Sequence, residues 1–512
     1  MLGRFRIETM PKLMFVLHLL LASFLVAGVV AFYYQARISL NTDGEIDYGE
    51  GIVMWQAANV TDWTRAFHPI ENYPHNVFHY TPLFHLVSRF VNRVTGNLLV
   101  AGRLTSILSF IGTCLIGALL TARVLPPARE PIARAMGALV AGTLVFMTPI
   151  WFWATLMRVD ALAIFFSVSG VALFVLARRR RALGFVAFAL FVAAVYTKQT
   201  SLAAPAACFI LALVEKPRYA IQLAAFAVAL GLAILLSLHI ATDGLFLRHI
   251  VTYNQNPYIL TGLLDKLGRH AAPIVVPLFF AFTFPVALLY RRLRHGRGKY
   301  ETIRLIMTRS DFERCVIVVG LYFLFAAALA AATISKVGAY DNYYLEMDVA
   351  MCFLCGLFVG WLLRRDSFHP SRYHLIQQVV VMVLFVIATF NNRANASRLR
   401  ADYANPPVDY SPEVVKFLRT LPGPVYSEDM VVLMQAGKEV PAEPAIITAL
   451  AMDGKWNESG FVERIRHGEF NAIVIRYSLQ NDQRFSKGVV DAIHERYYQT
   501  DNIGTFKIYL PR

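Results

Sequence analysis

Long apolar runs alternate with short charged clusters along most of the chain. The apolar runs fall near Lys12–Tyr34, Leu98–Thr121, Ala135–Leu156, Asp160–Ala177, Ala182–Tyr196, Ser201–Val214, Tyr219–Ile240, Ala272–Tyr290, Cys315–Thr333, Glu346–Leu363 and His374–Phe390. A helix that crosses the hydrocarbon core of a bilayer needs about 20 mostly apolar residues, and fewer where neighbouring helices bury it. The pattern therefore predicts an α-helical polytopic membrane protein with about eleven transmembrane helices.

The composition supports this fold class and excludes several others. Hydrophobic residues make up 57% of the 512 residues and charged residues 16%, whereas soluble domains carry about 25% charged residues. Disordered and collagen-like chains are excluded, and a soluble multi-domain enzyme is disfavoured. The five cysteines lie in or beside apolar runs, so no disulfide framework is predicted. Cys352 and Cys355 have C-x-x-C spacing within an apolar run, and we interpret them as packing residues.

The basic residues follow every second apolar run. They are Arg4, Arg6 and Lys12 before the first run, and then Arg123, Arg129, Arg134, Arg178, Arg179, Arg180, Arg181, Lys216, Arg218, Arg291, Arg292, Arg294, Arg297, Lys299, Arg304, Arg309, Arg364, Arg365 and Arg372. Basic loops of membrane proteins face the cytoplasm. The pattern predicts a multi-pass protein of the plasma (inner) membrane with a cytoplasmic amino terminus. Because no basic face or stacking motif accompanies the net charge of +15, we expect no nucleic-acid partner.

The opposite, extracytoplasmic (periplasmic) side is predicted to hold a large first loop at residues 35–97, a second loop at Thr242–Ala271 and the end of the chain. We divide the chain into a transmembrane domain, 1–404, and a small soluble α/β domain, 405–512. Strands are expected at Val425–Ser427, Ala472–Tyr477 and Thr505–Leu510, and helices at Phe461–His467 and Ser486–Tyr497. The domain has no Gly-rich phosphate loop, so we assign it no nucleotide site.

The first extracytoplasmic loop opens with four carboxylates, Asp43, Glu45, Asp47 and Glu50, before an expected helix at Ile52–Ala58. Asp47 and Glu50 are three residues apart, so they lie on one side of the start of this helix. One interpretation is a capping box with no further role. The alternative is a general base, because crowded carboxylates beside a bilayer have raised pKa values.

Cations and carboxylates also lie at the extracytoplasmic ends of other runs. Arg158 and Asp160 begin the fourth run, and Lys198 lies in the tight turn between the fifth and sixth. These residues are either interface anchors or a phosphate-binding set in which Asp160 orients Arg158. Glu346 and Asp348 enter the tenth run, where an unpaired carboxylate is costly, and we expect Lys336 or an arginine as their partner.

The polar and aromatic second loop contains Tyr253. It either covers a sugar or lies on the membrane. The histidines of the first loop match no zinc-ligand spacing, so no metal site is predicted from them.

The sequence resembles the glycosyltransferase C superfamily, most of all its branch of protein mannosyltransferases, lipid-A aminoarabinose transferases and lipopolysaccharide-core transferases. The resemblance covers roughly residues 15–393 and rests on five short motifs in order, namely DYGE at Asp47–Glu50, YTPL at Tyr80–Leu83, RVDAL at Arg158–Leu162, TKQT at Thr197–Thr200 and NYYLE at Asn342–Glu346. Relatives often carry two adjacent acidic residues in the first motif and Tyr-Pro-Pro-Leu in the second. These departures leave the base open between Asp47 and Glu50, with Asp43 behind them.

The resemblance implies an inverting hexosyl- or pentosyltransferase that uses a polyprenyl-phosphate sugar as donor and a hydroxyl of an extracytoplasmic glycan, lipid or protein as acceptor. Asp47 or Glu50 would accept the proton of the hydroxyl. Arg158, Asp160 and Lys198 would bind the lipid phosphate. Tyr80, Tyr253, Asn342, Tyr343 and Glu346 would bind the sugar or the acceptor.

The leaving group carries one phosphoryl group, so fixed cations can stabilise it. Some relatives use a divalent metal, and the need for one stays open here.

The rival classes of function are a lipid or sugar transporter (or flippase), a polysaccharide polymerase and an inactive scaffold. Transporters commonly show internal repeats, and we find none.

Overall fold

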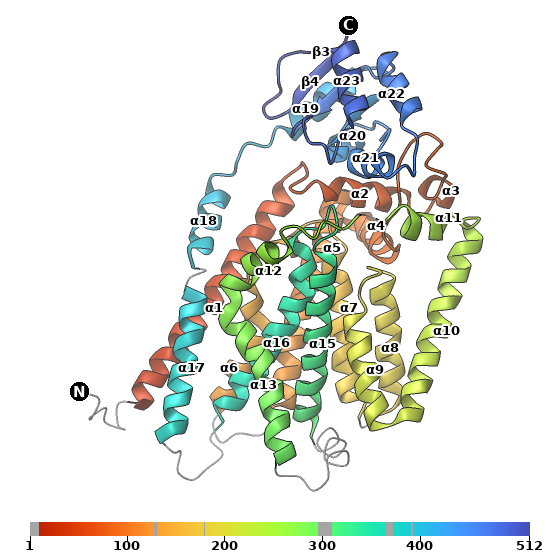
Figure 1. Ribbon diagram of the computed structural model, residues 1–512. Coiled ribbons are helices and arrows are strands. Elements are labelled where there is room, and N and C mark those ends of the chain that lie inside the picture. Colours follow the sequence, from red (N-terminus) through yellow and green to blue (C-terminus); the bar gives the residue numbers. More distant parts are fainter. Residues whose placement is uncertain are drawn as a thin grey trace.

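The computed structural model describes residues 10–126, 131–178, 180–255, 257–294, 310–364, 372–390 and 393–512. It shows a bundle of long helices with a small α/β region on one end (Figure 1). The helical, polytopic fold class predicted from the sequence is confirmed. Some predicted cytoplasmic residues lie outside the described residues, and these are Arg4, Arg6, Arg129, Arg179, Arg297, Lys299, Arg304, Arg309 and Arg365.

Each predicted apolar run coincides with helical structure. The helices are α1 (Met10–Asn41), α5 (Leu98–Val124), α6 (Pro131–Thr143), α7 (Asp160–Leu176), α8 (Ala182–Val195), α9 (Ala203–Glu215), α10 (Pro217–Ala241), α13 (Val275–Arg294), α15 (Asp311–Thr333), α16 (Leu345–Leu362) and α17 (Arg372–Phe390). Within the described ranges, 6 spans are long and apolar enough to cross a membrane. The remaining apolar helices are shorter, so the exact number of crossings stays a prediction.

Two of the predicted runs differ in detail from the observed helices. The first helix continues to Asn41, so the first loop begins later than expected. The third run is not one helix. After α6 it continues in two 3-10 turns, η2 (Leu144–Met147) and η3 (Trp151–Thr155). Pro149 lies between these turns, and proline lacks the N–H that a continuous helix needs.

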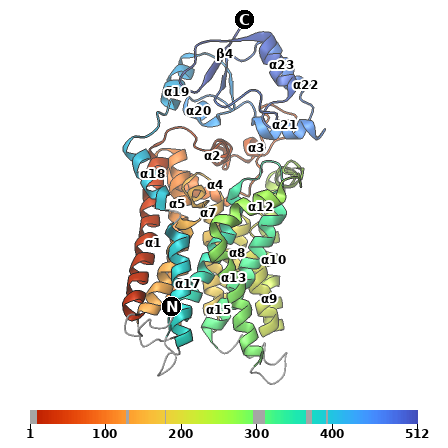
Figure 2. The same cartoon turned by 60° about the vertical axis from the view of Figure 1, so that its left-hand side comes forward.

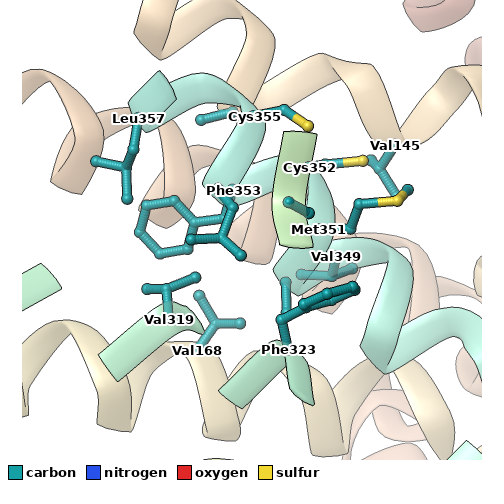
Figure 3. Packing of buried hydrophobic residues seen from close by; sticks show 14 of the residues in the cluster. Val145, Val168, Val319, Phe323, Val349, Met351, Cys352, Phe353, Cys355 and Leu357 are labelled. Atoms are coloured by element: carbon teal, nitrogen blue, oxygen red, sulfur yellow. The ribbon is translucent and has the colours of Figure 1, made fainter. Parts of the chain in front are cut away.

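Helix α16 lies at the centre of the bundle, against α6. A Cβ at Gly356 would lie 2.4 Å from the Cβ of Ala141 and 2.6 Å from the carbonyl oxygen of Gly137. Such close backbone approach is typical of membrane helices that pack through small residues. Cys352 and Cys355 point into the surrounding apolar cluster (Figure 3) and are fully buried. They pack there as the sequence analysis interprets them.

Short helices form a layer between the bundle and the α/β region (Figures 1 and 2). The layer contains α2 (Gly49–Asn59), α3 (Trp63–Ala66), α4 (Leu83–Thr95), α11 (Leu245–Leu247), the π turn η4 (Arg248–Thr252) and α12 (Leu263–Ala271). Helix α2 includes the expected helix at Ile52–Ala58 and begins three residues earlier. The 3-10 turns η5 (Ala272–Ile274) and η6 (Asp341–Tyr344) connect this layer to the bundle.

The α/β region follows α18 (Arg393–Ala404) and contains a mixed four-stranded sheet of order β1-β2-β4-β3. Its elements are α19 (Ser411–Thr420), β1 (Val425–Ser427), α20 (Met430–Gln435), α21 (Pro444–Met452), α22 (Ser459–Arg466), β2 (Ala472–Ile475), α23 (Lys487–Arg496), β3 (Tyr497–Gln499) and β4 (Lys507–Pro511). Val425 pairs with Ala472 in the parallel β1–β2 ladder, and Ile473 pairs with Tyr509 in the antiparallel β2–β4 ladder. The expected strands and helices are present, whereas α19, α20, α21 and β3 were not predicted.

We use "C-terminal domain" for residues 405–512, with the boundary as the sequence predicts it. The described basic residues of the predicted cytoplasmic loops and the predicted extracytoplasmic loops lie at opposite ends of the bundle. Lys216, for example, joins α9 to α10 at the end away from the C-terminal domain (Figure 1). We call the other end of the bundle its domain end.

Candidate active site beneath the C-terminal domain

The two candidate bases in the first loop have different surroundings. Glu50 is fully buried in the first turn of α2, and its carboxylate accepts four hydrogen bonds. Two come from Arg103, at 2.8 and 2.7 Å, and the others come from the backbone N–H groups of Met157 and Ile46, both at 2.8 Å. Burial alone would raise the pKa of this carboxyl, but the pairing with Arg103 lowers the pKa below its ordinary value. Because these hydrogen bonds occupy both oxygens of the Glu50 carboxylate, we interpret Glu50 as a structural residue.

Arg103 was not predicted as a functional residue, although an arginine inside an apolar run is a signal. It lies on α5 and is fully buried. Besides its two bonds to Glu50, it donates to the carbonyl oxygens of Ser39, Thr42 and Gly44, at 2.6, 2.6 and 2.8 Å. The guanidinium therefore connects the end of α1, the segment after it and the start of α2.

Asp47 lies between these anchored points and is more accessible. Its side chain is 18% exposed and forms an ion pair of 3.0 Å with Arg158. The same carboxylate oxygen accepts the N–H of Gly49 at 3.0 Å, and the Glu50 carboxylate accepts the N–H of Ile46. These bonds are not the expected capping box, because the N-cap of α2 is Tyr48, whose side chain does not cap the helix, and Glu50 binds the N–H of Ile46 and not that of Asp47. Asp47 still has a second oxygen toward which an acceptor hydroxyl can approach.

A second ion pair lies two residues further along, at the start of α7. Lys198 donates to Asp160 at 2.6 Å, and the side-chain amide of Asn342 donates to both Asp160 oxygens, at 3.1 and 3.2 Å. A carboxylate at a helix amino terminus is also favoured by the helix dipole. Three segments far apart in the sequence therefore meet here, namely the Arg158–Asp160 turn, the α8–α9 turn and η6.

Tyr343 and Glu346 extend this group toward α15 and α16. The Lys198 ammonium lies 4.7 Å from the centre of the Tyr343 ring, which is within the range of a cation–π contact. Glu346 accepts a hydrogen bond of 3.0 Å from the hydroxyl of Tyr322 on α15. The expectation that Lys336 pairs with Glu346 or Asp348 is wrong. Lys336 instead lies over the ring of Tyr258, with its ammonium 5.5 Å from the ring centre.

The partner of Asp348 comes from the second loop instead. His270 on α12 contacts its carboxylate at 2.9 Å and stacks on Tyr344 with the rings 3.9 Å apart. This buried contact attaches α12 to α16, just beyond the turn of helix that contains Glu346.

The second ion pair, Asn342, Tyr343 and Glu346 line a small cavity that is partly open to solvent. Its polar wall is formed by Asp160, Lys198, Thr200, Ser201, Thr333, Asn342, Tyr343 and Glu346, and its apolar wall by Ala163, Ile164, Ala326, Leu329 and Ala330. The apolar wall comes from the start of α7 and the end of α15. The arrangement suits a ligand with a charged head and a hydrocarbon tail.

Tyr80 lies near this group, and Tyr253 does not line the cavity. The Tyr80 segment is attached to the α8–α9 turn, because Thr81 donates to the Val195 carbonyl and Gln199 donates to the His79 carbonyl, both at 2.9 Å. Burial raises the pKa of Tyr80 to about 12 against the opposing effect of the Arg158 cation, so its hydroxyl stays protonated. Tyr253 is 2% exposed and packs in a separate apolar cluster with residues of the first loop and the C-terminal domain.

The side chains of this site do not form an obvious metal site. Within the described ranges no three His, Cys, Asp or Glu residues are grouped so that they could hold a metal ion. The carboxylates Asp47 and Asp160 are each paired with a cation instead. We therefore derive no step through a metal.

Comparison with known proteins identifies the fold. No family model and no curated protein matches the sequence. Among solved structures, the chain is similar to ArnT from Cupriavidus metallidurans bound to undecaprenyl phosphate, with 13% identity and a TM-score of 0.59 over 94% of this chain and 96% of that one. The apo structure of the same ArnT gives 12% identity and a TM-score of 0.60 over the same shares.

A second similarity is to the oligosaccharyltransferase of Archaeoglobus fulgidus in complex with zinc and sulfate. It has 12% identity and a TM-score of 0.52, over 95% of this chain and 73% of that one. The chain therefore has the same fold as these two solved proteins.

Proposed function

We propose that this protein is an inverting glycosyltransferase that moves a sugar from a polyprenyl-phosphate donor to a hydroxyl group at the domain end of the bundle. The observation that carries the proposal is the cavity itself. Its polar wall holds Lys198, and its apolar wall comes from two helices of the bundle. Arg158, two residues before Asp160 of the polar wall, pairs with the accessible carboxylate of Asp47. One of the similar folds was solved with undecaprenyl phosphate, a ligand of this kind.

We assign the role of general base to Asp47. The acceptor hydroxyl gives its proton to the Asp47 carboxylate while its oxygen attacks the anomeric carbon. The bond between that carbon and the phosphate oxygen breaks, and its electron pair leaves with the polyprenyl phosphate. Attack opposite to the leaving group inverts the anomeric configuration. Glu50, the other predicted base, has a structural role in this proposal because Arg103 and two backbone N–H groups occupy its oxygens.

Lys198 and Arg158 supply the positive charge for the leaving phosphate. Fixed cations in a site with little water stabilise charge that develops in the transition state. Asp160 holds Lys198 in place at 2.6 Å, and Asn342 fixes Asp160. Tyr80, Tyr343 and Glu346 are proposed to contact the sugar or the acceptor. Tyr253, which packs away from the cavity, is proposed to affect binding only through the second loop.

We further propose that the domain end faces the periplasm, as the basic loops predict. The acceptor would then be a glycan, lipid or protein of the cell envelope. The proposal does not need the C-terminal domain to contact the sugar, because none of its residues lines the cavity.

The test is sugar transfer by the purified protein in detergent, from a panel of radiolabelled polyprenyl-phosphate hexoses and pentoses to a membrane extract. Loss of a general base lowers the rate by about 10²–10⁴-fold. We expect this loss in Asp47→Asn. The matched control is Glu71→Gln, which removes an exposed carboxylate from the same loop.

The anomeric configuration of the product, read by NMR, is expected to be inverted. Full activity of Asp47→Asn would show that another group is the base. Movement of label across a vesicle membrane without transfer would identify a transporter and refute the proposal.

A further inference from the structure

The segment that contains Asp47 has no regular secondary structure of its own. Residues 42–48 connect the end of α1 to the start of α2 without forming a helix or strand. Such a connection takes many conformations unless other parts of the molecule hold it. Arg103 holds it from the bundle side, through the carbonyl oxygens of Thr42 and Gly44.

The C-terminal domain holds the same segment from the other side. Gln435 donates to the carbonyl oxygen of Asp43 at 2.7 Å, and Asp409 accepts the N–H of Gly44 at 2.9 Å. Arg476 donates to the carbonyl oxygen of Glu45 at 2.8 Å. Three successive residues before Asp47 are therefore bound through their backbone to a part of the chain more than 360 residues away in sequence.

The contact is close as well as polar. A Cβ at Gly44 would lie 2.1 Å from the hydroxyl of Ser411, so a larger residue at this point would displace the Ser411 side chain. On the other side of Asp47, the Tyr48 hydroxyl donates to Glu443 and accepts the N–H of Ala445. The Tyr48 ring stacks under Arg484, whose guanidinium lies 4.0 Å from its centre.

Arg476 has a central place in this interface. Besides the Glu45 carbonyl, it binds the carboxylate of Asp429 at 3.0 Å. Asp429 is fully buried and caps α20 by accepting the N–H groups of Val431 and Val432. A rigid helix of the domain is thereby connected through one guanidinium to the segment that contains the proposed base.

We infer that the C-terminal domain is a positioning element of the active site, and that Arg476 is the residue through which it fixes the Asp47 segment. The inference rests on the proposed role of Asp47. A catalytic group must be held close to its reactive geometry, and a misplacement of about 1 Å costs roughly 100-fold in rate. The domain therefore acts on kcat without touching the substrate.

The experiment compares Arg476→Gln with Arg476→Lys and with the control Arg466→Gln, which removes an exposed ion-paired arginine from the same domain. We expect Arg476→Gln to lower kcat at least tenfold, with the donor KM within twofold of wild type. Arg476→Lys keeps a cationic donor and is expected to recover part of the loss. Arg466→Gln is expected to behave as wild type. An unchanged kcat in Arg476→Gln would overturn the inference.

A second measurement does not depend on activity. Hydrogen exchange followed by mass spectrometry is expected to accelerate in residues 42–50 of Arg476→Gln and to stay unchanged in the long helices. If Arg476→Gln does not fold, Asp409→Asn replaces it, because it weakens a different contact to the same segment. Faster exchange in a protein that transfers no sugar would support the positioning and refute the proposed function. Unchanged exchange would refute the positioning, whatever the activity.

Discussion

The buried pair of Arg103 and Glu50 gives a prediction with a defined magnitude. Both side chains are fully buried, and Arg103→Met leaves the Glu50 carboxylate without its cation. Breaking a buried pair by removing one partner costs about 3–5 kcal/mol, because the remaining charge is uncompensated. The carbonyl oxygens of Ser39, Thr42 and Gly44 also lose their donor. We expect the melting temperature to fall by on the order of 5 °C.

The assay is thermal unfolding in detergent, followed by tryptophan fluorescence. Arg123→Met is the matched control, because Arg123 is an exposed arginine in the last turn of the same helix, α5. We expect the control to melt within about 1 °C of wild type, since surface charges contribute about 0–1 kcal/mol. The double variant Arg103→Met/Glu50→Leu removes both charges and is expected to be more stable than Arg103→Met alone.

Two results would refute this reasoning. If Arg103→Met melts like Arg123→Met, the guanidinium is not the anchor that its five hydrogen bonds indicate. If the effects of Arg103→Met and Glu50→Leu simply add in the double variant, the two charges are not coupled.

Three further predictions concern the cavity, the interface and the bundle. Lys198→Met removes the cation of the cavity wall, and we expect the KM for the donor to rise at least tenfold in the transfer assay, while Lys216→Met on the opposite side has no effect. Burial, followed by the nearby Asp429 carboxylate, raises the pKa of Glu45 well above its ordinary value. A carboxyl whose pKa is raised in the folded protein stabilises the fold at low pH, where it is protonated. This stabilisation is lost as the pH rises through the pKa of the folded state. The melting temperature of wild type is therefore expected to fall, relative to Glu45→Gln, as the pH rises above 5, and parallel curves for the two proteins would contradict this. Gly356→Ala places a methyl group 2.4 Å from Ala141, whereas Gly231→Ala on α10 meets nothing within 4 Å, so only the first is expected to lower the melting temperature.

Much of the fold could be predicted because the bilayer imposes a simple rule on the sequence. Every backbone polar group in hydrocarbon must be bonded within its own segment, so apolar length indicates a helix. This rule does not hold for an apolar segment that is buried among other helices, because neighbouring residues can bond its backbone groups and it does not need to be one continuous helix. The stretch after α6 is such a case, because Pro149 divides it into 3-10 turns. In the C-terminal domain, α19 and α20 are short, and their helical form depends on packing that no local pattern contains.

The candidate site could be predicted in part, because charged residues beside apolar runs are few and costly. Asp47, Arg158, Asp160 and Lys198 do form two ion pairs at one end of the bundle. The sequence alone did not distinguish which of Asp47 and Glu50 is the candidate base. The difference depends on Arg103, which is more than 50 residues away in the chain and becomes visible only when α5 packs against α2. The placement of Tyr253 likewise depends on how the second loop folds over the first.

The charges of the cavity lead to a last prediction, about Glu346. The ion pairs of Asp47 with Arg158 and of Asp160 with Lys198 leave no net charge, so this set of residues is net negative when Glu346 is ionised. A bound polyprenyl phosphate adds like charge beside it, and the repulsion weakens binding. In the complete donor, hydrogen bonds from the sugar hydroxyl groups to the Glu346 carboxylate offset this repulsion. Glu346→Gln is therefore expected to bind the sugar-free polyprenyl phosphate several-fold more tightly, measured as product inhibition, while kcat/KM for the donor falls. Tyr322→Phe removes the hydroxyl that contacts Glu346 but keeps the carboxyl group, so it is expected to change product inhibition less than Glu346→Gln does. Equal inhibition of wild type and Glu346→Gln would show that the Glu346 charge does not act on the phosphate.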